Sequence, residues 1–234
     1  MNIIVTGASR GIGYATVKKL VEKANHSIIA ISRNGEALEK LKEECAEINP
    51  DAKVVPFPFD LVQGVIKDEL EPLVKEYLGS VDRLVNNAGR LINKPFEEFT
   101  EKEFDEMFDV NVKSVFHLIQ AVLPLFNGEG HIVNISSMGG YQGSSKFPGL
   151  SLYSASKGAL TILSEALAEE LKERKISSNS LALGAVQTEM LGEAFPGVKA
   201  PLKPDEMAEF VTDFTLKGHK YFNGKTLPVS SSTP

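Results

Sequence analysis

Residues 2–13 of the chain, NIIVTGASRGIG, decide the fold, because they run from an apolar strand through a glycine-rich turn into a helix. The glycines Gly7, Gly11 and Gly13 follow the spacing G-x-x-x-G-x-G. Positions without side chains let the backbone approach a pyrophosphate, and the helix N-terminus offers free N–H donors and a positive dipole end. Three glycines alone can also form a plain tight turn. Their place between a strand and a helix favours a dinucleotide-binding loop.

The same alternation of strand and helix continues along the chain. Short apolar runs predict strands at 2–6, 27–31, 53–57, 81–86, 130–136, 176–183 and 225–229. Helical spacing predicts helices at 11–24, at 37–48, up to about residue 78, and at 101–126, 152–174 and 205–217. Strands that are apolar on both faces belong in a parallel sheet covered by helices. Right-handed crossovers then give a doubly wound α/β fold.

The chain of 234 residues contains no linker, internal repeat or low-complexity tract. A single domain spanning 1–234 is therefore expected. One stretch, 189–203, is irregular and rich in Gly, Pro and Ala. It is either a slack loop or a mobile lid.

Composition and charge exclude several classes of protein. A net charge of −6 lacks the basic surface of a nucleic-acid-binding protein. The single cysteine, Cys45, lies on the apolar stripe of its helix and is expected in the core. No apolar run reaches the ~18 residues of a membrane span, and no basic leader precedes the first strand, so a cytoplasmic protein is expected. The four histidines lack metal-ligand spacing, so no metal site is predicted.

The end of the second strand bears on cofactor choice. A site that prefers NAD usually has a carboxylate there for the ribose hydroxyls, but this chain has Ser32 followed by Arg33. Arg10, in the glycine loop, can reach the same region. Because a planar guanidinium suits a phosphate, these residues favour recognition of the 2′-phosphate of NADP(H). Both arginines could instead be ordinary solvated surface charges.

Two further motifs carry chemistry. The fourth strand ends in VNNAG at 85–89, which by itself could be only a turn. Tyr153 and Lys157 stand four residues apart, on one face of a helix. Such a pair is usually a lysine that covers an aromatic ring at the surface. Ser137 adds a hydroxyl just past the fifth strand, where strand ends meet ligands.

Together these residues resemble the pattern of the short-chain dehydrogenase/reductase family, from residue 1 to about residue 229. The matching positions, in family order, are 6–13, Asp60, 86–89, Asn111, Ser137, Tyr153, Lys157 and 184–188. The resemblance implies a single-domain Rossmann fold with a seven-stranded parallel sheet. It also implies a Ser137–Tyr153–Lys157 catalytic centre supported by Asn111.

The resemblance further implies where a nicotinamide cofactor binds. Asp60 would meet the adenine, Asn87 a ribose and Thr188 the nicotinamide amide. The expected cofactor-binding residues are Gly7, Ser9, Arg10, Gly11, Ile12, Gly13, Ser32, Arg33, Asp60, Leu61, Asn87, Ala88, Gly89, Tyr153, Lys157, Gly184, Val186 and Thr188.

The chemistry of these groups leads to a predicted activity. Reduction of a ketone leaves negative charge on oxygen, which a tyrosine can neutralise by donating its proton. A free tyrosine titrates near ~10, and the nearby ammonium of Lys157 is expected to lower the pKa of Tyr153. Ser137 would hold the carbonyl oxygen. We therefore expect an NADPH-dependent enzyme that reduces a ketone or aldehyde, including 3-oxoacyl compounds. The alternatives are an alcohol dehydrogenase that works in oxidation and an NADP(H)-sensing protein without turnover.

Three departures from the family pattern affect the substrate side. Leu183 replaces the usual proline before Gly184, the segment between Ser137 and Tyr153 is longer than usual, and 189–203 is shorter. An open cleft is expected.

The helix at 101–126 carries more apolar residues than one stripe needs, so it is either buried under its neighbours or a subunit interface. We expect a homodimer or homotetramer.

Overall fold

The computed structural model describes residues 1–231; positions 232–234 of the predicted domain lie outside the described residues. The strands are β1 (Asn2–Thr6), β2 (Ser27–Ser32), β3 (Lys53–Pro58), β4 (Val81–Asn86), β5 (Phe126–Ser137), β6 (Ile176–Leu183) and β7 (Thr226–Val229). The helices are α1 (Gly11–Lys23), α2 (Gly35–Ile48), α3 (Ile66–Tyr77), α4 (Glu101–Phe108), α5 (Ser114–Val122), α6 (Ser151–Glu170), α7 (Glu189–Ala194) and α8 (Pro204–Lys217). In this part of the chain, no helix combines the length and apolarity needed to cross a membrane.

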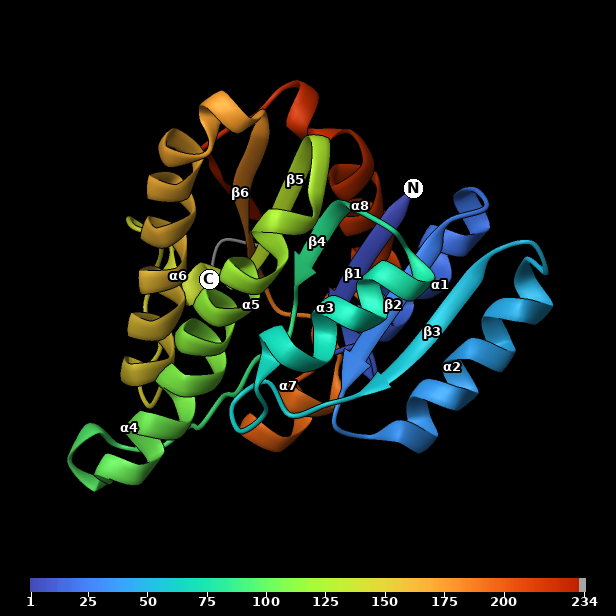
Figure 1. Ribbon diagram of the computed structural model, residues 1–234. Helices are drawn as coiled ribbons and strands as arrows, with labels where there is room; N and C mark the ends of the chain where they lie inside the picture. The colour runs from blue at the N-terminus through green and yellow to red at the C-terminus, as the bar shows by residue number, and fades with distance from the viewer. Residues whose placement is uncertain (232–234) are drawn as a thin grey trace.

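The seven strands form one sheet in the order β3-β2-β1-β4-β5-β6-β7, and all neighbours are parallel. The chain therefore runs outward from β1 to β3 and then returns to add β4 on the other side of β1. Ligands bind beyond the carboxyl ends of such strands, where the order reverses. The predicted doubly wound, single-domain Rossmann fold is confirmed (Figure 1).

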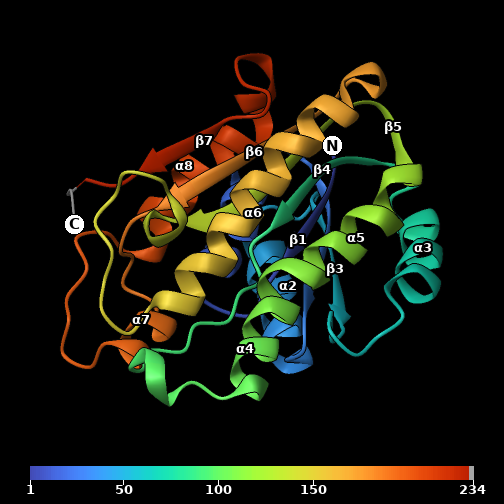
Figure 2. The same ribbon diagram turned by 90° about the vertical axis from the view of Figure 1, so that its left-hand side faces the viewer.

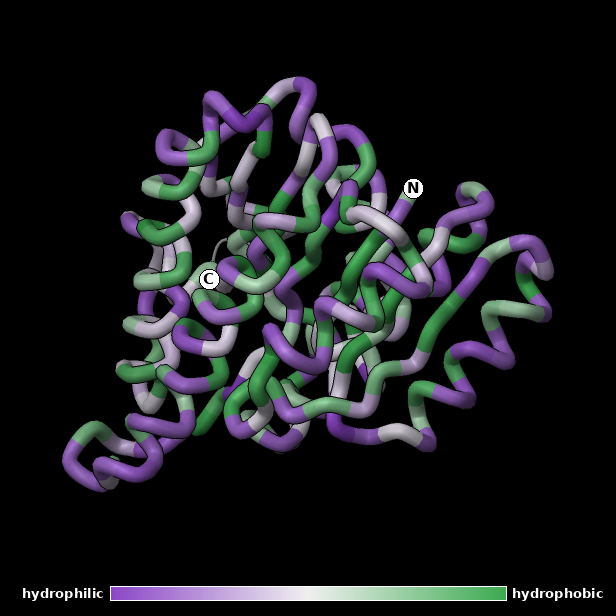
Figure 3. The backbone as a smooth tube through the Cα atoms, in the orientation of Figure 1, coloured by the Kyte–Doolittle hydropathy of each residue, from purple (hydrophilic) through white to green (hydrophobic). Residues whose placement is uncertain are grey.

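Helices cover both faces of the sheet and bury two apolar layers (Figures 1 and 2). Helices α1, α2 and α8 pack on one face, and α3, α5 and α6 pack on the other. Hydrophobic residues follow the central strands, whereas the outer turns of the helices are largely hydrophilic (Figure 3). Cys45 is in the first layer, 2% exposed, as predicted. Burial also raises the pKa of its thiol to about 12, so the thiolate form is disfavoured.

The predicted helix at 101–126 is confirmed as one continuous helical run, but it is not α-helical throughout. Helix α4 ends at Phe108, a π-helical turn covers Asp109–Lys113, and α5 then runs from Ser114 to Val122. The turn places Asn111, fully buried, against the backbone of Arg90. A π turn often marks such a local functional constraint.

The apolar surface of this region is only partly covered. Met107, Val115 and Leu118 are buried as core residues, but Phe104 and Phe116 remain exposed. Burial under neighbouring helices therefore accounts for only part of the pattern.

Strand β5 also differs from its prediction, because it begins at Phe126 rather than at residue 130. Phe126 pairs with Val81, and the register between β4 and β5 shifts before Arg83. The intervening sequence, NGEG at 127–130, contains two glycines and is typical of a turn. Pairing with the neighbouring strand overrides that local preference.

Candidate active site

A cleft of about 1670 Å³ opens at the carboxyl edge of the sheet. Ordinary ligand pockets measure about 300–1,000 Å³, so this one has room for a dinucleotide and a second ligand. Its walls come from the glycine loop, the ends of β2, β4, β5 and β6, and the segment 189–203. Residues predicted from distant parts of the sequence therefore meet in one place.

The glycine loop is shaped by positions at which a side chain would not fit. A Cβ at Gly13 would lie 2.3 Å from the Gly7 carbonyl oxygen, and one at Gly7 would lie 2.9 Å from Ala88 Cα. Gly7 and Gly11 also have φ angles of 65° and 58°, which favour glycine. The loop and β4 therefore pack closely, with the backbone of Gly7 and Gly11 open to the cleft.

The N-terminus of α1 fits a bound phosphate. Arg10 is its N-cap residue, and the Arg10 side chain makes no capping hydrogen bond to the first turn. The unpaired N–H groups of a first turn are the donors that bind anions at helix N-termini. The loop's residues thus fit the pyrophosphate of a nicotinamide dinucleotide.

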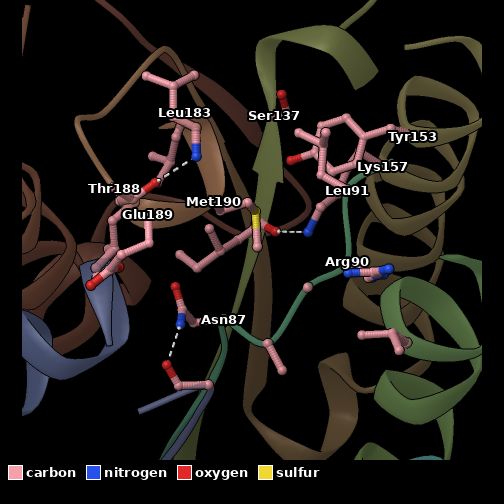
Figure 4. A pocket seen from close by; sticks show the side chains of 18 of the residues that line it. Asn87, Arg90, Leu91, Ser137, Tyr153, Lys157, Leu183, Thr188, Glu189 and Met190 are labelled. Carbon is pink, nitrogen blue, oxygen red and sulfur yellow. Dashed lines mark hydrogen bonds between the residues drawn. The ribbon is translucent and has the colours of Figure 1, made fainter. Parts of the chain in front are cut away.

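Thr6 and Asn87 tie the loop to the end of β4. The amides of Asn87 and Ala88 both donate to Thr6 Oγ1 at 3.0 Å. Asn87 Nδ2 donates to the carbonyl oxygens of Thr6, at 3.0 Å, and Gly7, at 3.2 Å. Asn87 was predicted to contact a ribose; its amide nitrogen is already used to hold the glycine loop (Figure 4).

The two predicted arginines have different surroundings. Both line the cleft, as do Ser32, Asp60 and Leu61. Arg10 forms an ion pair of 2.9 Å with Glu193 of α7. Arg33 is exposed, and within residues 1–231 no ion pair or hydrogen bond of its guanidinium is recorded.

Ser137, Tyr153 and Lys157 lie together at the other end of the cleft (Figure 4). Ser137 ends β5, while the other two stand one turn apart near the start of α6. Lys157 Nζ donates to the Ile135 carbonyl oxygen at 2.8 Å, and Ser136 Oγ donates to the Lys157 carbonyl oxygen at 2.9 Å. These two bonds fix the first turns of α6 against β5.

Burial shifts the pKa of both titratable groups. It lowers the pKa of Lys157 to about 8, because a charged amine loses hydration in the interior. Burial also raises the pKa of Tyr153, although a hydrogen bond with Ser137 acts in the opposite direction. The predicted lowering of the Tyr153 pKa by Lys157 is therefore wrong for the free protein. Lys157 Nζ lies 6.0 Å from the centre of the Tyr153 ring and is bonded to backbone.

Asn111 does not line the cleft, unlike the other three predicted catalytic residues. Its Oδ1 accepts from the Arg90 amide at 2.8 Å, and its Nδ2 donates to the Arg90 carbonyl oxygen at 2.9 Å. Nδ2 also donates to Ser156 Oγ at 2.9 Å, and that hydroxyl donates to the Tyr153 carbonyl oxygen at 2.8 Å. Asn111 and Ser156 thus link the backbone after β4 to the turn that carries Tyr153.

All but one of the remaining predicted cofactor-binding residues line the cleft, including Gly184, Val186 and Thr188 after β6. Gly13 does not, because it lies behind Gly7 in the contact described above. Leu183 in place of proline leaves this turn intact, with the Gly184 amide donating to the Val229 carbonyl oxygen at 2.9 Å. Across residues 1–231, no three His, Cys, Asp or Glu side chains are grouped as a metal site would require.

Sequence reasoning missed Leu91 and Asn93, and it covered Met190 and Phe195 only as members of the segment 189–203. Leu91, Met190 and Phe195 line the cleft but belong to no motif. For Leu91 the available signal was its position shortly after VNNAG. Asn93 gave no signal: its Nδ2 donates to the Ala194 carbonyl oxygen at 2.8 Å and links the segment after β4 to α7.

Known proteins share this sequence pattern and fold. The sequence model of a family described as short chain dehydrogenase matches residues 1–199. An uncharacterized oxidoreductase of Staphylococcus epidermidis is 30% identical over 227 residues, which cover 96% of this chain and 95% of that protein.

Two solved structures extend the comparison. A 3-ketoacyl-(acyl-carrier-protein) reductase from Brucella melitensis, complexed with NADH, is 26% identical with a TM-score of 0.85, covering 97% of this chain and 96% of that one. A short chain dehydrogenase from Burkholderia cenocepacia, in complex with NADP, is 25% identical with a TM-score of 0.87, covering 99% of this chain and 96% of that one. Since the family match spans most of the chain and the relatives share its fold, this protein belongs to the short-chain dehydrogenase family of oxidoreductases.

Proposed function

We propose that the protein is an NADPH-dependent reductase that converts a ketone or aldehyde, of which 3-oxoacyl compounds are one class, to an alcohol. The observation that carries the proposal is that Ser137, Tyr153 and Lys157 line the same cleft as the glycine loop. Hydride donor and proton donor can therefore act on one bound carbonyl. The Brucella relative, a 3-ketoacyl reductase, supports this class of reaction.

Each residue has a defined task in this reaction. When bound, NADPH supplies the hydride that reduces the carbonyl carbon. Tyr153 donates its proton to the carbonyl oxygen and regains one from solvent. Its raised pKa suits this role, because the phenol stays protonated at neutral pH. Ser137 donates a hydrogen bond to the same oxygen, and the ammonium of Lys157 favours the negative charge that develops on the phenol.

The preference for NADPH rests on the adenine end of the cleft. Ser32 brings no carboxylate there, and the exposed guanidinium of Arg33 is available for a 2′-phosphate. Arg10 would have to exchange Glu193 for the phosphate. The relatives support either cofactor, since one was solved with NADP and another with NADH.

An NADPH-consumption screen over ketones, aldehydes and oxoacyl thioesters tests the function. Turnover of at least one carbonyl compound, faster with NADPH than with NADH, is expected. Activity only with alcohols and NADP⁺ would favour a dehydrogenase working in oxidation. Tight NADPH binding with no turnover in either direction would favour a sensing protein.

The segment 189–203 is proposed to be the substrate lid. Its helix α7 contacts Arg10 through Glu193 and Asn93 through Ala194, so it spans both ends of the cleft. Lids of this kind commonly gate substrate entry. Hydrogen exchange of 189–203 is expected to slow when NADPH and a carbonyl ligand are added. Equal exchange rates in both states would count against a lid.

Homo-oligomerisation and a cytoplasmic location remain proposals as well. Helices α5 and α6 lie side by side on one face (Figures 1 and 2), with Phe116 and Ile162 exposed. An apolar face of this kind fits a second copy of the chain. Light scattering of the protein and of a Phe116→Glu/Ile162→Glu variant tests the oligomer, and cell fractionation tests the location.

A further inference from the structure

We propose that the substrate is an apolar ketone or aldehyde, whose carbonyl is carried by a hydrocarbon frame, and not a polyhydroxylated carbonyl compound such as a sugar. This inference rests on the proposed reductase function and names the class of substrate for that site. It follows from the side chains that surround Ser137 and Tyr153.

Three separate segments each bring apolar side chains to this end of the cleft. They are the stretch after β4, the loop between β5 and α6, and the segment 189–203. Their apolar lining residues include Leu91, Phe147, Leu150, Met190, Phe195 and Val198. Leu91 and Met190 lie in the same pocket as Ser137 and Tyr153 (Figure 4).

Charged residues also line the cleft: they lie on α4 and the turn after it, in the stretch after β4 and in the segment 189–203, and they are Arg90, Glu101, Lys102, Asp105, Glu106, Asp109, Glu189 and Lys199. Arg90 lines the cleft but faces α4, where it pairs with Glu106 at 3.8 Å, and its backbone is held by Asn111. Asn93 is bonded to the Ala194 carbonyl oxygen. Lys199 is an exposed residue of the segment 189–203. Directly around the reacting pair, Ser137 and Tyr153 stand beside the apolar Leu91 and Met190, an arrangement suited to a single carbonyl oxygen on an apolar frame.

Two large apolar side chains at the substrate end of the cleft are still open to solvent. Phe147 is 45% exposed and Val198 is 49% exposed, and they come from two different segments. Exposed apolar surface inside a cleft is typical of a site that an apolar ligand covers. A hydrocarbon frame bound there would remove both side chains from water.

The segments that hold these two side chains are anchored. Ser144 Oγ donates to the carbonyl oxygens of Met138 and Tyr141, and Lys146 Nζ also donates to the latter, at 2.6 Å. On the other segment, Gln187 Oε1 accepts from the Ala200 amide at 2.8 Å. The part of the wall that Phe147 forms is therefore in place before a substrate binds, which reduces the cost of ordering it, and Val198 completes the wall when the proposed lid closes.

A sugar would lose hydration in this surrounding without regaining hydrogen bonds. An apolar pocket rejects a ligand that merely adds one hydroxyl by up to about 100-fold. An isosteric pair isolates this effect: 3-pentanone and 1,3-dihydroxyacetone have the same shape, and two methyl groups of the first replace two hydroxyl groups of the second.

The experiment compares kcat/KM for these two ketones, with acetophenone as a larger apolar substrate. We expect 3-pentanone to exceed dihydroxyacetone by about 100-fold, and acetophenone to exceed both. Phe147→Ser and Val198→Ser should each raise KM for acetophenone by about three- to tenfold. Phe210→Ser and Val65→Ser replace exposed residues that do not line the cleft and serve as matched controls without effect.

The outcomes separate this inference from the proposed function. Reduction of dihydroxyacetone as efficiently as 3-pentanone, or better, overturns the apolar substrate class but leaves the reductase function standing. An acetophenone KM that does not change in the Phe147 and Val198 variants overturns the assigned wall. If no carbonyl compound is reduced, quenching of NADPH fluorescence by each ketone still decides: binding of acetophenone alone supports the apolar site, and binding of dihydroxyacetone alone overturns it.

Discussion

The two ends of the cleft are built in different ways. At the glycine loop, backbone packs on backbone: Gly13 and Gly7 leave no space for a side chain, and Thr6 and Asn87 bond the loop to β4. At the substrate end, three loops meet through side chains, and several of those side chains are exposed. Even a small substitution in the glycine loop should therefore impair cofactor binding, whereas substitutions at the substrate end should change which molecule binds.

The largest expected effect comes from the reacting group between the two ends. Tyr153→Phe removes the proton donor but keeps the ring, so kcat should fall by about 10²–10⁴-fold or more while NADPH affinity stays nearly unchanged. Tyr221→Phe, at a highly exposed tyrosine, is the control. Near-normal turnover of the Tyr153 variant would refute the assigned proton donor.

Lys157→Ala should impair both ends at once. Its ammonium is expected to serve the cofactor as well as Tyr153, so turnover should fall about 10–100-fold and NADPH affinity should also weaken. Lys172→Ala, at an exposed lysine, should change neither. Unchanged NADPH affinity in the Lys157 variant would argue against its contact with the cofactor.

The lowered pKa of Lys157 also gives a pH dependence. The amine is charged below about pH 8 and loses its proton above it, so kcat/KM should decline as the pH rises through about 8. In the unfolded chain the same amine keeps its proton up to about pH 10.5. Between about pH 8 and 10.5 the unfolded state therefore binds more protons than the folded state, so the free energy of unfolding should rise with pH in this range. Lys157→Ala should lack both trends. A parent profile that stays flat through pH 8 would contradict the role of the ammonium.

A matched pair of glycine substitutions tests the contrast between the two ends directly. Gly13→Ala places a Cβ 2.3 Å from the Gly7 carbonyl oxygen, so the loop must shift. A cost of about 1–3 kcal/mol is expected, with weaker NADPH binding. Gly192→Ala, in α7, meets nothing within 4 Å and should be neutral or slightly stabilising. Calorimetry measures the stability of each variant, and titration measures its NADPH affinity. Equal effects of the two substitutions would show that the glycine loop is no more tightly packed than α7.

Cofactor choice is a smaller effect at the first end. A hydrogen bond to a charged group contributes about 1.5–3 kcal/mol, so the parent should prefer NADPH to NADH by about 10–100-fold. The double change Ser32→Asp with Arg33→Ala should weaken NADPH and leave or improve NADH. Titration of both cofactors checks this. Equal affinities in the parent would mean that the arginines are ordinary surface charges.

The smallest effect concerns the ion pair that connects the ends. Glu193 competes with a 2′-phosphate for Arg10, and exposed pairs of this kind are weak. Glu193→Gln should therefore improve NADPH affinity about two- to fivefold and leave NADH affinity unchanged. Glu173→Gln, at an exposed residue away from the cleft, is the control. An equal change for both cofactors would show that Glu193 does not act on the 2′-phosphate.

The sequence by itself determined the alternation of strands and helices, the glycine loop and the spacing of Tyr153 and Lys157, because each depends on neighbours within a few residues. The doubly wound sheet then follows from that alternation and from right-handed crossovers. Apolar periodicity, a glycine at a positive φ and a four-residue helical spacing are all local properties. Tertiary structure alone decided the π turn at Asn111, the early start of β5, the Arg10–Glu193 pair and the raised pKa of Tyr153. Those features arise from contacts between segments far apart in the chain, whose partners exist only once the sheet has brought the strand ends together.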